Sequence, residues 1–151
     1  MHAQPSHPTT LPARLLGCAG LLPFAAAAAL AALGPQPWRG AALAALATYG
    51  AVILSFLGAV HWGLALKGPI EEAASVWPRL GLGVVPALVA WVALSLPVEQ
   101  ALLLLAAGVL ATTAVETLAA RRHLVPPDYL RLRWALSAGA VACLGIGALA
   151  A

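Results

Sequence analysis

Residues 41–66 read AALAALATYGAVILSFLGAVHWGLAL, and this stretch decides the fold. It contains no Asp, Glu, Lys or Arg, and His61 is its single histidine. A membrane-spanning helix needs about 20 predominantly apolar residues, because the hydrocarbon core of a bilayer is about 30 Å thick. The 26 residues of this stretch exceed that length, so they predict a transmembrane helix.

The rest of the chain has the same character. Its 151 residues are 62% hydrophobic and 9% charged, with a mean hydropathy of +0.93. A soluble domain carries about 25% charged residues, and a domain of this size hides only about two thirds of its chain surface. The composition therefore excludes a soluble monomer. It also excludes a disordered chain, which requires low hydrophobicity, and leaves an integral membrane protein made of helices.

Proline, glycine and charged residues divide the chain into a tail and five apolar stretches. Residues 1–14 hold three prolines and no apolar period, which predicts a flexible N-terminal tail. Pro23 and Pro86 fall inside apolar stretches, where a membrane helix tolerates proline at the cost of a kink. The expected fold class is all-α: a polytopic membrane helix bundle, residues 15–151, with five transmembrane helices. Their expected ranges are 15–34, 41–66, 80–96, 98–120 and 133–151.

Basic residues near the span ends predict the orientation. Cytoplasmic loops of membrane proteins carry an excess of Lys and Arg. With the N-terminus placed in the cytoplasm, only Arg39 lies on the outer side. The Arg- and Ala-rich composition is typical of bacterial genomes rich in G and C. We therefore expect a bacterial inner-membrane protein with its N-terminus cytoplasmic and its C-terminus periplasmic. The seven basic residues on the inner side are Arg14, Lys67, Arg79, Arg121, Arg122, Arg131 and Arg133.

Five side chains form a candidate polar cluster near the inner face. His61 lies five residues before the end of its span, and Glu116 lies four residues before the end of a span that runs in the same direction. Arg133 begins the last span at that face, Tyr129 lies one turn earlier, and Trp62 adds an aromatic rim. An intramembrane acid is costly and needs a partner. The cluster could bind a lipid headgroup, relay a proton, or form structural hydrogen bonds between helices.

Small residues predict where the helices pack. Gly50, Gly58 and His61 lie on one side of the 41–66 helix, which we expect to face other helices because glycine lets backbones approach closely. The opposite side, which includes Tyr49 and Phe56, is expected to face lipid. The last span carries a small residue at every fourth position, and these residues predict packing within the chain or between copies. They are Ala135, Gly139, Cys143, Gly147 and Ala151.

Motifs for cofactor or catalytic chemistry are absent from the sequence. Of the histidines, only His61 lies in a span, whereas a bis-His haem needs two and a closed zinc site needs four ligands. The sequence has no HExxH, phosphate-binding loop or nucleophile elbow. Cys18 and Cys143 are expected at different depths, too far apart for a disulfide. The sequence predicts no metal, no cofactor and no enzymatic activity.

Four stretches resemble a family of small multi-pass membrane proteins of unknown function, which includes mitochondrial transmembrane protein 69. The most specific is YGAVILSFLGAVHWGLAL at 49–66, and LLPF at 21–24, VVPALVAW at 84–91 and PPDYLRLRWALS at 126–137 agree with it. The likeness covers residues 15 to about 145. Asp128 and Ser137 depart from it, standing where an aromatic residue and a threonine are expected. The resemblance implies an inner-membrane location and five spans, and it implies no activity.

Three functions are compatible with these observations. The first is a structural membrane protein that supports a larger complex, indicated by the small-residue stripes. The second is a small transporter or proton-conducting protein that uses His61 and Glu116. The third is a lipid-headgroup-binding protein or intramembrane enzyme with Trp62 and Arg133 at its rim. The expected partners are the lipid bilayer and other membrane proteins or further copies of the chain, and no nucleic acid.

Overall fold

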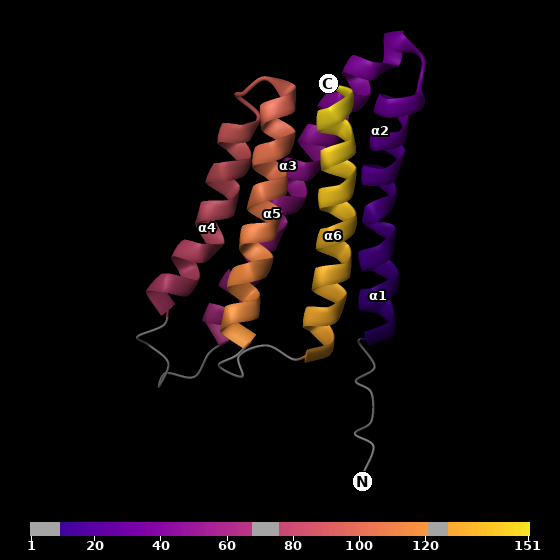
Figure 1. The fold of residues 1–151 in the computed structure, drawn as a ribbon. Coiled ribbons are helices and arrows are strands. Elements are labelled where there is room, and N and C mark those ends of the chain that lie inside the picture. Colours follow the sequence, from indigo (N-terminus) through magenta and orange to yellow (C-terminus); the bar gives the residue numbers. More distant parts are fainter. Residues whose placement is uncertain (1–9, 68–75, 121–126) are drawn as a thin grey trace.

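The computed structural model describes residues 10–67, 76–120 and 127–151, and all its regular elements in these ranges are helices. The helices run along one long axis; α1 continues into α2 in the same direction, and from α2 onward successive helices alternate in direction (Figure 1). α3 packs against α2, α4, α5 and α6 and so occupies the centre of the bundle. The helices are α1 (Thr10–Ala19), α2 (Leu21–Leu33), α3 (Gln36–Lys67), α4 (Val76–Ala93), α5 (Val98–Ala120) and α6 (Pro127–Ala150).

The prediction of an all-α membrane bundle is confirmed. By length and composition, four helical stretches in the described ranges can cross a membrane: Leu11–Leu33, Gln36–Val60, Val98–Leu118 and Leu130–Ala150. The third expected span, 80–96, corresponds to α4, whose strongly apolar part is only Gly83–Ala93. α4 nevertheless lies alongside α5 over much of its length (Figure 1).

Four helices begin earlier than expected: α3 begins at Gln36 rather than at residue 41, α4 begins at Val76 rather than at residue 80, and α1 and α6 also begin early. α1 begins at Thr10, inside the segment 1–14 that was expected to be a flexible tail. Pro12 stands in its first turn, where the missing N–H would have had no intrahelical partner. α6 begins at Pro127 rather than at residue 133. Proline favours the first helical position.

The first span is made of two helical segments. α1 and α2 meet at Gly20, three residues before Pro23. The proline ring clashes with the carbonyl four residues earlier, that of Ala19, and removes its hydrogen bond. Tyr49 from α3 donates a hydrogen bond to the Gly20 carbonyl at 2.9 Å. A neighbouring helix thus supplies a donor where the proline disturbs the backbone.

The assignment of Tyr49 to the lipid face was therefore wrong. Its ring packs edge-on against Phe24 of α2, with centroids 4.9 Å apart, and its hydroxyl is held by Gly20. Phe56 is 63% exposed, as expected for a residue facing lipid. A tyrosine needs a partner for its hydroxyl in hydrocarbon, and this requirement outweighs the helical period.

The core is a continuous apolar layer between α2, α3, α5 and α6. Its largest side chains are completely enclosed, and the alanines among them let the helices approach closely. The largest fully buried apolar residues are Phe24, Leu46, Leu54, Leu102, Leu105, Val109 and Leu144. These residues occupy the middle of the bundle and the half nearest the C-terminus. The buried charged residues, Glu116 and Arg133, lie toward the opposite end, which we call the N-terminal end.

Candidate functional site

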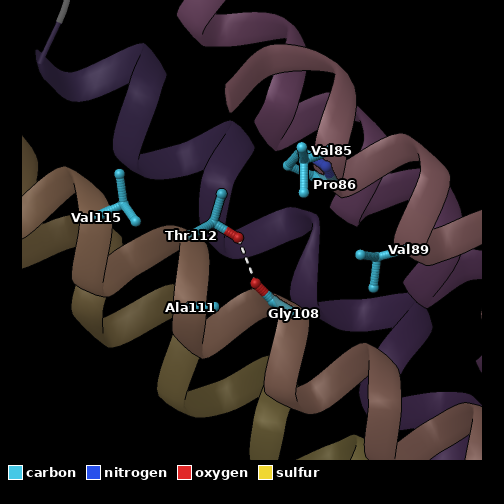
Figure 2. A pocket seen from close by; sticks show the side chains of 7 residues that line it. All are labelled: Val85, Pro86, Val89, Gly108, Ala111, Thr112 and Val115. Atoms are coloured by element: carbon cyan, nitrogen blue, oxygen red, sulfur yellow. Dashed lines mark hydrogen bonds between the residues drawn. The ribbon is translucent and has the colours of Figure 1, made fainter. Parts of the chain in front are cut away.

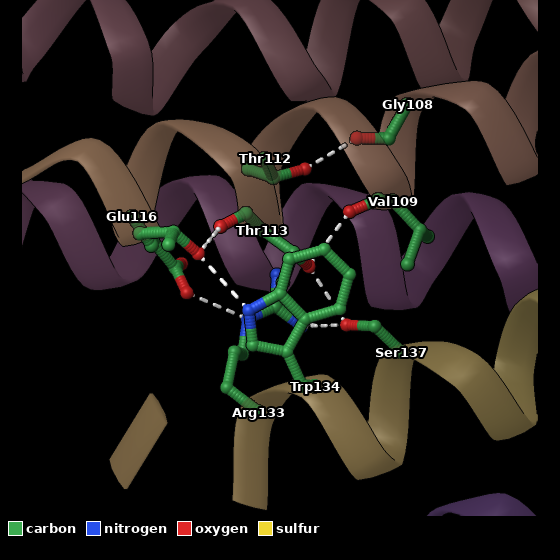
Figure 3. Close-up of polar contacts among 9 residues, drawn as sticks. Gly108, Val109, Thr112, Thr113, Glu116, Arg133, Trp134 and Ser137 are labelled. Carbon is green, nitrogen blue, oxygen red and sulfur yellow. Dashed lines mark hydrogen bonds and ion pairs between the residues drawn. The ribbon is translucent and has the colours of Figure 1, made fainter. Parts of the chain in front are cut away.

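A buried ion pair joins α5 and α6 near the N-terminal end of the bundle (Figure 3). Arg133 Nε donates to Glu116 Oε2 at 2.7 Å. Glu116 is 2% exposed and Arg133 is 6% exposed. The antiparallel α5–α6 hairpin sets this meeting, because Glu116 lies four residues before the end of α5 and Arg133 six residues after the start of α6. The structure thus brings together two of the five predicted cluster residues.

Two hydroxyl groups extend the ion pair toward the middle of the bundle. Arg133 Nη1 donates to Ser137 Oγ at 3.1 Å, and Ser137 Oγ lies 2.8 Å from Thr113 Oγ1. Thr113 Oγ1 in turn donates to the Val109 carbonyl at 2.9 Å. Both hydroxyl residues are fully buried.

These contacts fix the direction of every hydrogen bond in the series. The single hydroxyl proton of Thr113 goes to Val109, so Thr113 Oγ1 accepts the proton of Ser137. Ser137 Oγ then accepts from Arg133. Donation therefore runs one way, from the guanidinium through two hydroxyls to a backbone carbonyl. We call Thr113, Glu116, Arg133 and Ser137 the α5–α6 polar cluster.

A second link between the same helices lies at the bundle surface. Trp134 Nε1 donates to Thr117 Oγ1 at 3.0 Å, and Thr117 Oγ1 donates to the Thr113 carbonyl at 2.7 Å. Trp134 is 42% exposed, which suits the amphipathic indole at a membrane interface. The ion pair and this bond together fasten α5 to α6 at two neighbouring positions.

Sequence reasoning missed the roles of Thr113, Thr117 and Ser137. The signal was present in the spacing, because side chains three or four residues apart share one helix face. Thr113 precedes Glu116 by three residues, and Ser137 follows Arg133 by four. Reading these faces together would have predicted a hydroxyl-lined surround for the ion pair.

The structure does not bring Trp62 into the cluster. Its Nε1 donates to the Leu80 carbonyl of α4 at 3.1 Å, and its indole packs over Gly83. Trp62 is 44% exposed and fastens α3 to α4 instead. The side chains of His61 and Tyr129, the other two predicted members, lie outside the described residues.

The predicted packing glycines lie at close approaches between helices. A Cβ at Gly50 would stand 3.2 Å from Leu144 and 3.3 Å from Leu105, and one at Gly139 would stand 2.9 Å from Leu21. Gly58 meets the carbonyl of Gly83 in α4. Gly147 lies against Leu46 and Leu102. Cys143 is partly buried against the core, and it and the exposed Cys18 are both free thiols.

These contacts show that the stripe on α6 is used inside the chain. Gly139 packs against Leu21 of α2, whereas Gly147 packs against side chains of α3 and α5. Small residues at these positions let three other helices approach α6. The interpretation of this stripe as packing within the chain thus accounts for its two glycines.

An apolar cleft of about 120 Å³ lies between α4 and α5 (Figure 2). The hydroxyl of Thr112 donates its proton to the Gly108 carbonyl within its own helix, so it has no proton to donate to a ligand in the cleft. Thr112 lies one helical turn before Glu116, but neither Glu116 nor Arg133 lines the cleft. The cleft residues are Val85, Pro86, Val89, Gly108, Ala111, Thr112 and Val115.

Ligands for a metal do not gather in the part of the chain that is described. Within residues 10–67, 76–120 and 127–151, no three side chains of His, Cys, Asp or Glu come close enough to hold an ion.

The fold and this cluster define a small multi-pass helical membrane protein whose polar groups are enclosed between two of its helices. The chain belongs to the family described as protein of unknown function (DUF3429), whose model matches residues 9–149. It is similar to transmembrane protein 69 of Xenopus tropicalis, with 46% identity over 83 residues. The match covers 55% of this chain and 32% of that protein. No solved structure matches the chain.

Proposed function

We propose that this protein is a non-enzymatic component of the bacterial inner membrane that supports the assembly of a larger membrane complex. The N-terminus lies in the cytoplasm and the C-terminus in the periplasm. In this proposal the bundle is a preformed, rigid unit, and its lipid-facing helices receive partner proteins. The name of the similar frog protein states only that it is a transmembrane protein, so it suggests no activity for this chain.

The closed α5–α6 polar cluster carries this proposal. Glu116 and Arg133 are turned toward each other, and Arg133 also reaches Ser137. The cleft between α4 and α5 is lined mainly by apolar groups, and neither Glu116 nor Arg133 lines it. Charged groups that act on a substrate or a transported ion point into a cavity that it can enter. Here the charged groups join two helices, which is the arrangement of a structural cross-link.

The direction of the hydrogen bonds weighs against proton conduction. A relay requires each group to pass its proton to the next, whereas the series from Arg133 ends on the Val109 carbonyl. Beyond it, the bundle is filled by Leu102, Leu105 and Leu144, all fully buried. Apolar side chains in close packing leave no chain of donors and acceptors toward the C-terminal end.

The test is the size of the native assembly. The protein is tagged at its own chromosomal locus, extracted in mild detergent and resolved by blue-native electrophoresis with mass spectrometry of the band. We expect migration well above the 15.3 kDa of the chain together with at least one further membrane protein. Deletion of the gene should reduce the amount of that assembled partner. A monomer band at native expression, with no partner changed on deletion, would contradict the proposal.

A further inference from the structure

The cleft between α4 and α5 has a buried floor and an exposed rim (Figure 2). Pro86 is buried and Thr112 is 7% exposed, and both line the cleft. Val85 on α4 is 55% exposed, and Ala111 on α5 is also exposed. The cleft therefore opens sideways, on the surface that the bundle presents to its surroundings.

Two features of the helices create this cleft. α4 diverges from α5 toward the N-terminal end of the bundle (Figure 1). Gly108 adds no side chain between the two helices, and a Cβ there would lie 2.6 Å from Leu54 Cδ2 of α3. Leu54 thus closes the space behind Gly108. The cleft therefore follows α5 between Gly108 and Val115 and does not pass through the bundle.

The cleft lies at the depth of the hydrocarbon chains of a bilayer. Gly108 is twelve residues from the end of α5 and Val115 is five residues from it, or about 18 Å and about 8 Å along the helix axis. α5 has the length and composition of a membrane span, and the hydrocarbon core is about 30 Å thick. Both positions lie inside this core, where the surrounding lipids supply acyl chains and no headgroups.

The size and lining of the cleft restrict what fills it. Its volume of about 120 Å³ is slightly smaller than that of an engineered apolar cavity of about 150 Å³ that binds benzene. An α-helix with its side chains is about 10–12 Å across, so a single hydrocarbon chain fits the cleft and a partner helix does not. The Thr112 hydroxyl gives its proton to the Gly108 carbonyl, and the other lining groups are apolar, which favours a hydrocarbon over a polar ligand.

We propose that the α4–α5 cleft is a binding site for one acyl chain of a membrane lipid, which completes the packing of α4 against α5. Van der Waals packing holds helices together in a bilayer, and side chains that line an empty space lose these contacts. The bound chain contacts Val85 and Val89 of α4 and Ala111 and Val115 of α5. The site binds a lipid through its tail, and it stands independently of the assembly role proposed above.

Photolabelling of the unmodified chain tests this site. The purified protein is reconstituted into phosphatidylcholine vesicles in which some lipids carry a diazirine in one acyl chain, and labelled residues are mapped by mass spectrometry. Val115 is half-buried in the cleft, whereas Leu110 is 42% exposed outside it, on the same helix and at a depth between Gly108 and Val115. We expect Val115 to be labelled at least about threefold more than Leu110, because a bound chain stays in close contact with it. Labelling in proportion to exposure, or none at Val115, would overturn the proposal.

Two alanines of α5 provide matched variants for the same measurement. Ala111 lines the cleft, whereas Ala114 is exposed on the same helix and does not line it. Ala111→Leu places a larger side chain in the cleft, so we expect labelling of Val89 to fall at least about threefold, because the bound chain loses its contacts. Ala114→Leu should leave this labelling unchanged, and equal effects of the two variants would contradict the proposal. A fall in Val89 labelling as the protein-to-lipid ratio is raised would place a second copy of the chain in the cleft instead of a lipid.

Discussion

At the scale of single residues, a charge is tolerated inside this bundle because its neighbours satisfy it. Glu116 and Arg133 lie where an isolated charge would be costly, yet they meet at 2.7 Å, and Arg133 also donates to the Ser137 hydroxyl. Such a pair contributes little net stability compared with apolar residues of the same size, but removing one partner leaves the other charge buried and unpaired. The pair therefore specifies how α5 and α6 are rotated against each other.

Replacing Glu116 should accordingly be more harmful than replacing both partners. Glu116→Gln keeps the shape but removes the charge that balances Arg133, so we expect the free energy of unfolding to fall by about 3–5 kcal/mol. The double variant Glu116→Leu with Arg133→Met should regain most of that loss. Unfolding in detergent, followed by circular dichroism, measures both.

The control for this experiment is a glutamate on the same helix. Glu99 lies exposed in the first turn of α5, where an acid interacts only with the helix dipole, so Glu99→Gln should cost less than about 1 kcal/mol. If Glu116→Gln is no more harmful than this control, the ion pair does not hold the hairpin.

At the scale of helices, the α3–α4 contact accounts for the tryptophan of the conspicuous His-Trp-Gly segment. Trp62 covers Gly83 and donates to the Leu80 carbonyl, while Gly58 meets the Gly83 carbonyl one turn away. A helix whose strongly apolar part is as short as Gly83–Ala93 gains from such close contact. Van der Waals packing and hydrogen bonds hold helices together where lipid removes the hydrophobic drive between them.

Two glycines of α4 provide a matched test of this contact. A Cβ at Gly83 would collide with the Trp62 indole and approach the Gly58 carbonyl oxygen to 3.1 Å, whereas a Cβ at Gly81 meets nothing within 4 Å. We expect Gly83→Ala to lower the unfolding free energy by about 1–3 kcal/mol through overpacking. Gly81→Ala should be neutral or stabilising by up to about 1 kcal/mol, because alanine favours a helix. Equal melting temperatures of the two variants in detergent would show that α4 does not depend on this contact.

At the scale of the whole molecule, the number of crossings decides where the two ends lie. α1 begins and α6 ends at opposite ends of the bundle (Figure 1). Four stretches have the length and composition to cross, and α4 has a shorter apolar part. An N-terminus in the cytoplasm and a C-terminus in the periplasm therefore require that α4 crosses as the fifth helix.

Reporter fusions test this topology in cells. We expect alkaline phosphatase fused after Ala151 to be active, because it folds only outside the cytoplasm, and a green fluorescent protein at the same site to be dark. The same pair fused at the N-terminus should give the reverse result. If both ends report the cytoplasm, α4 does not cross and the bundle has an even number of spans.

The sequence by itself predicted the membrane class, the helical fold and the approximate helix ranges, together with the depth at which Glu116 and Arg133 meet. These properties follow from local composition, because the exclusion of water from about 20 consecutive residues depends on those residues alone. The depth of Glu116 and Arg133 in the membrane also follows from the sequence, because the rise per residue is constant along a helix. The early starts of α1 and α6 were not predicted, because proline was interpreted as a helix breaker rather than as a residue of the first helical turn.

Only the tertiary structure decided which helix faces meet. It turned Tyr49 inward to Gly20, placed Trp62 on α4 rather than in the cluster, and surrounded the ion pair with Thr113 and Ser137. The rotation of one helix against another depends on how side chains from distant parts of the chain interlock and satisfy each other's polar groups. That information belongs to pairs of helices, and no single stretch of sequence contains it.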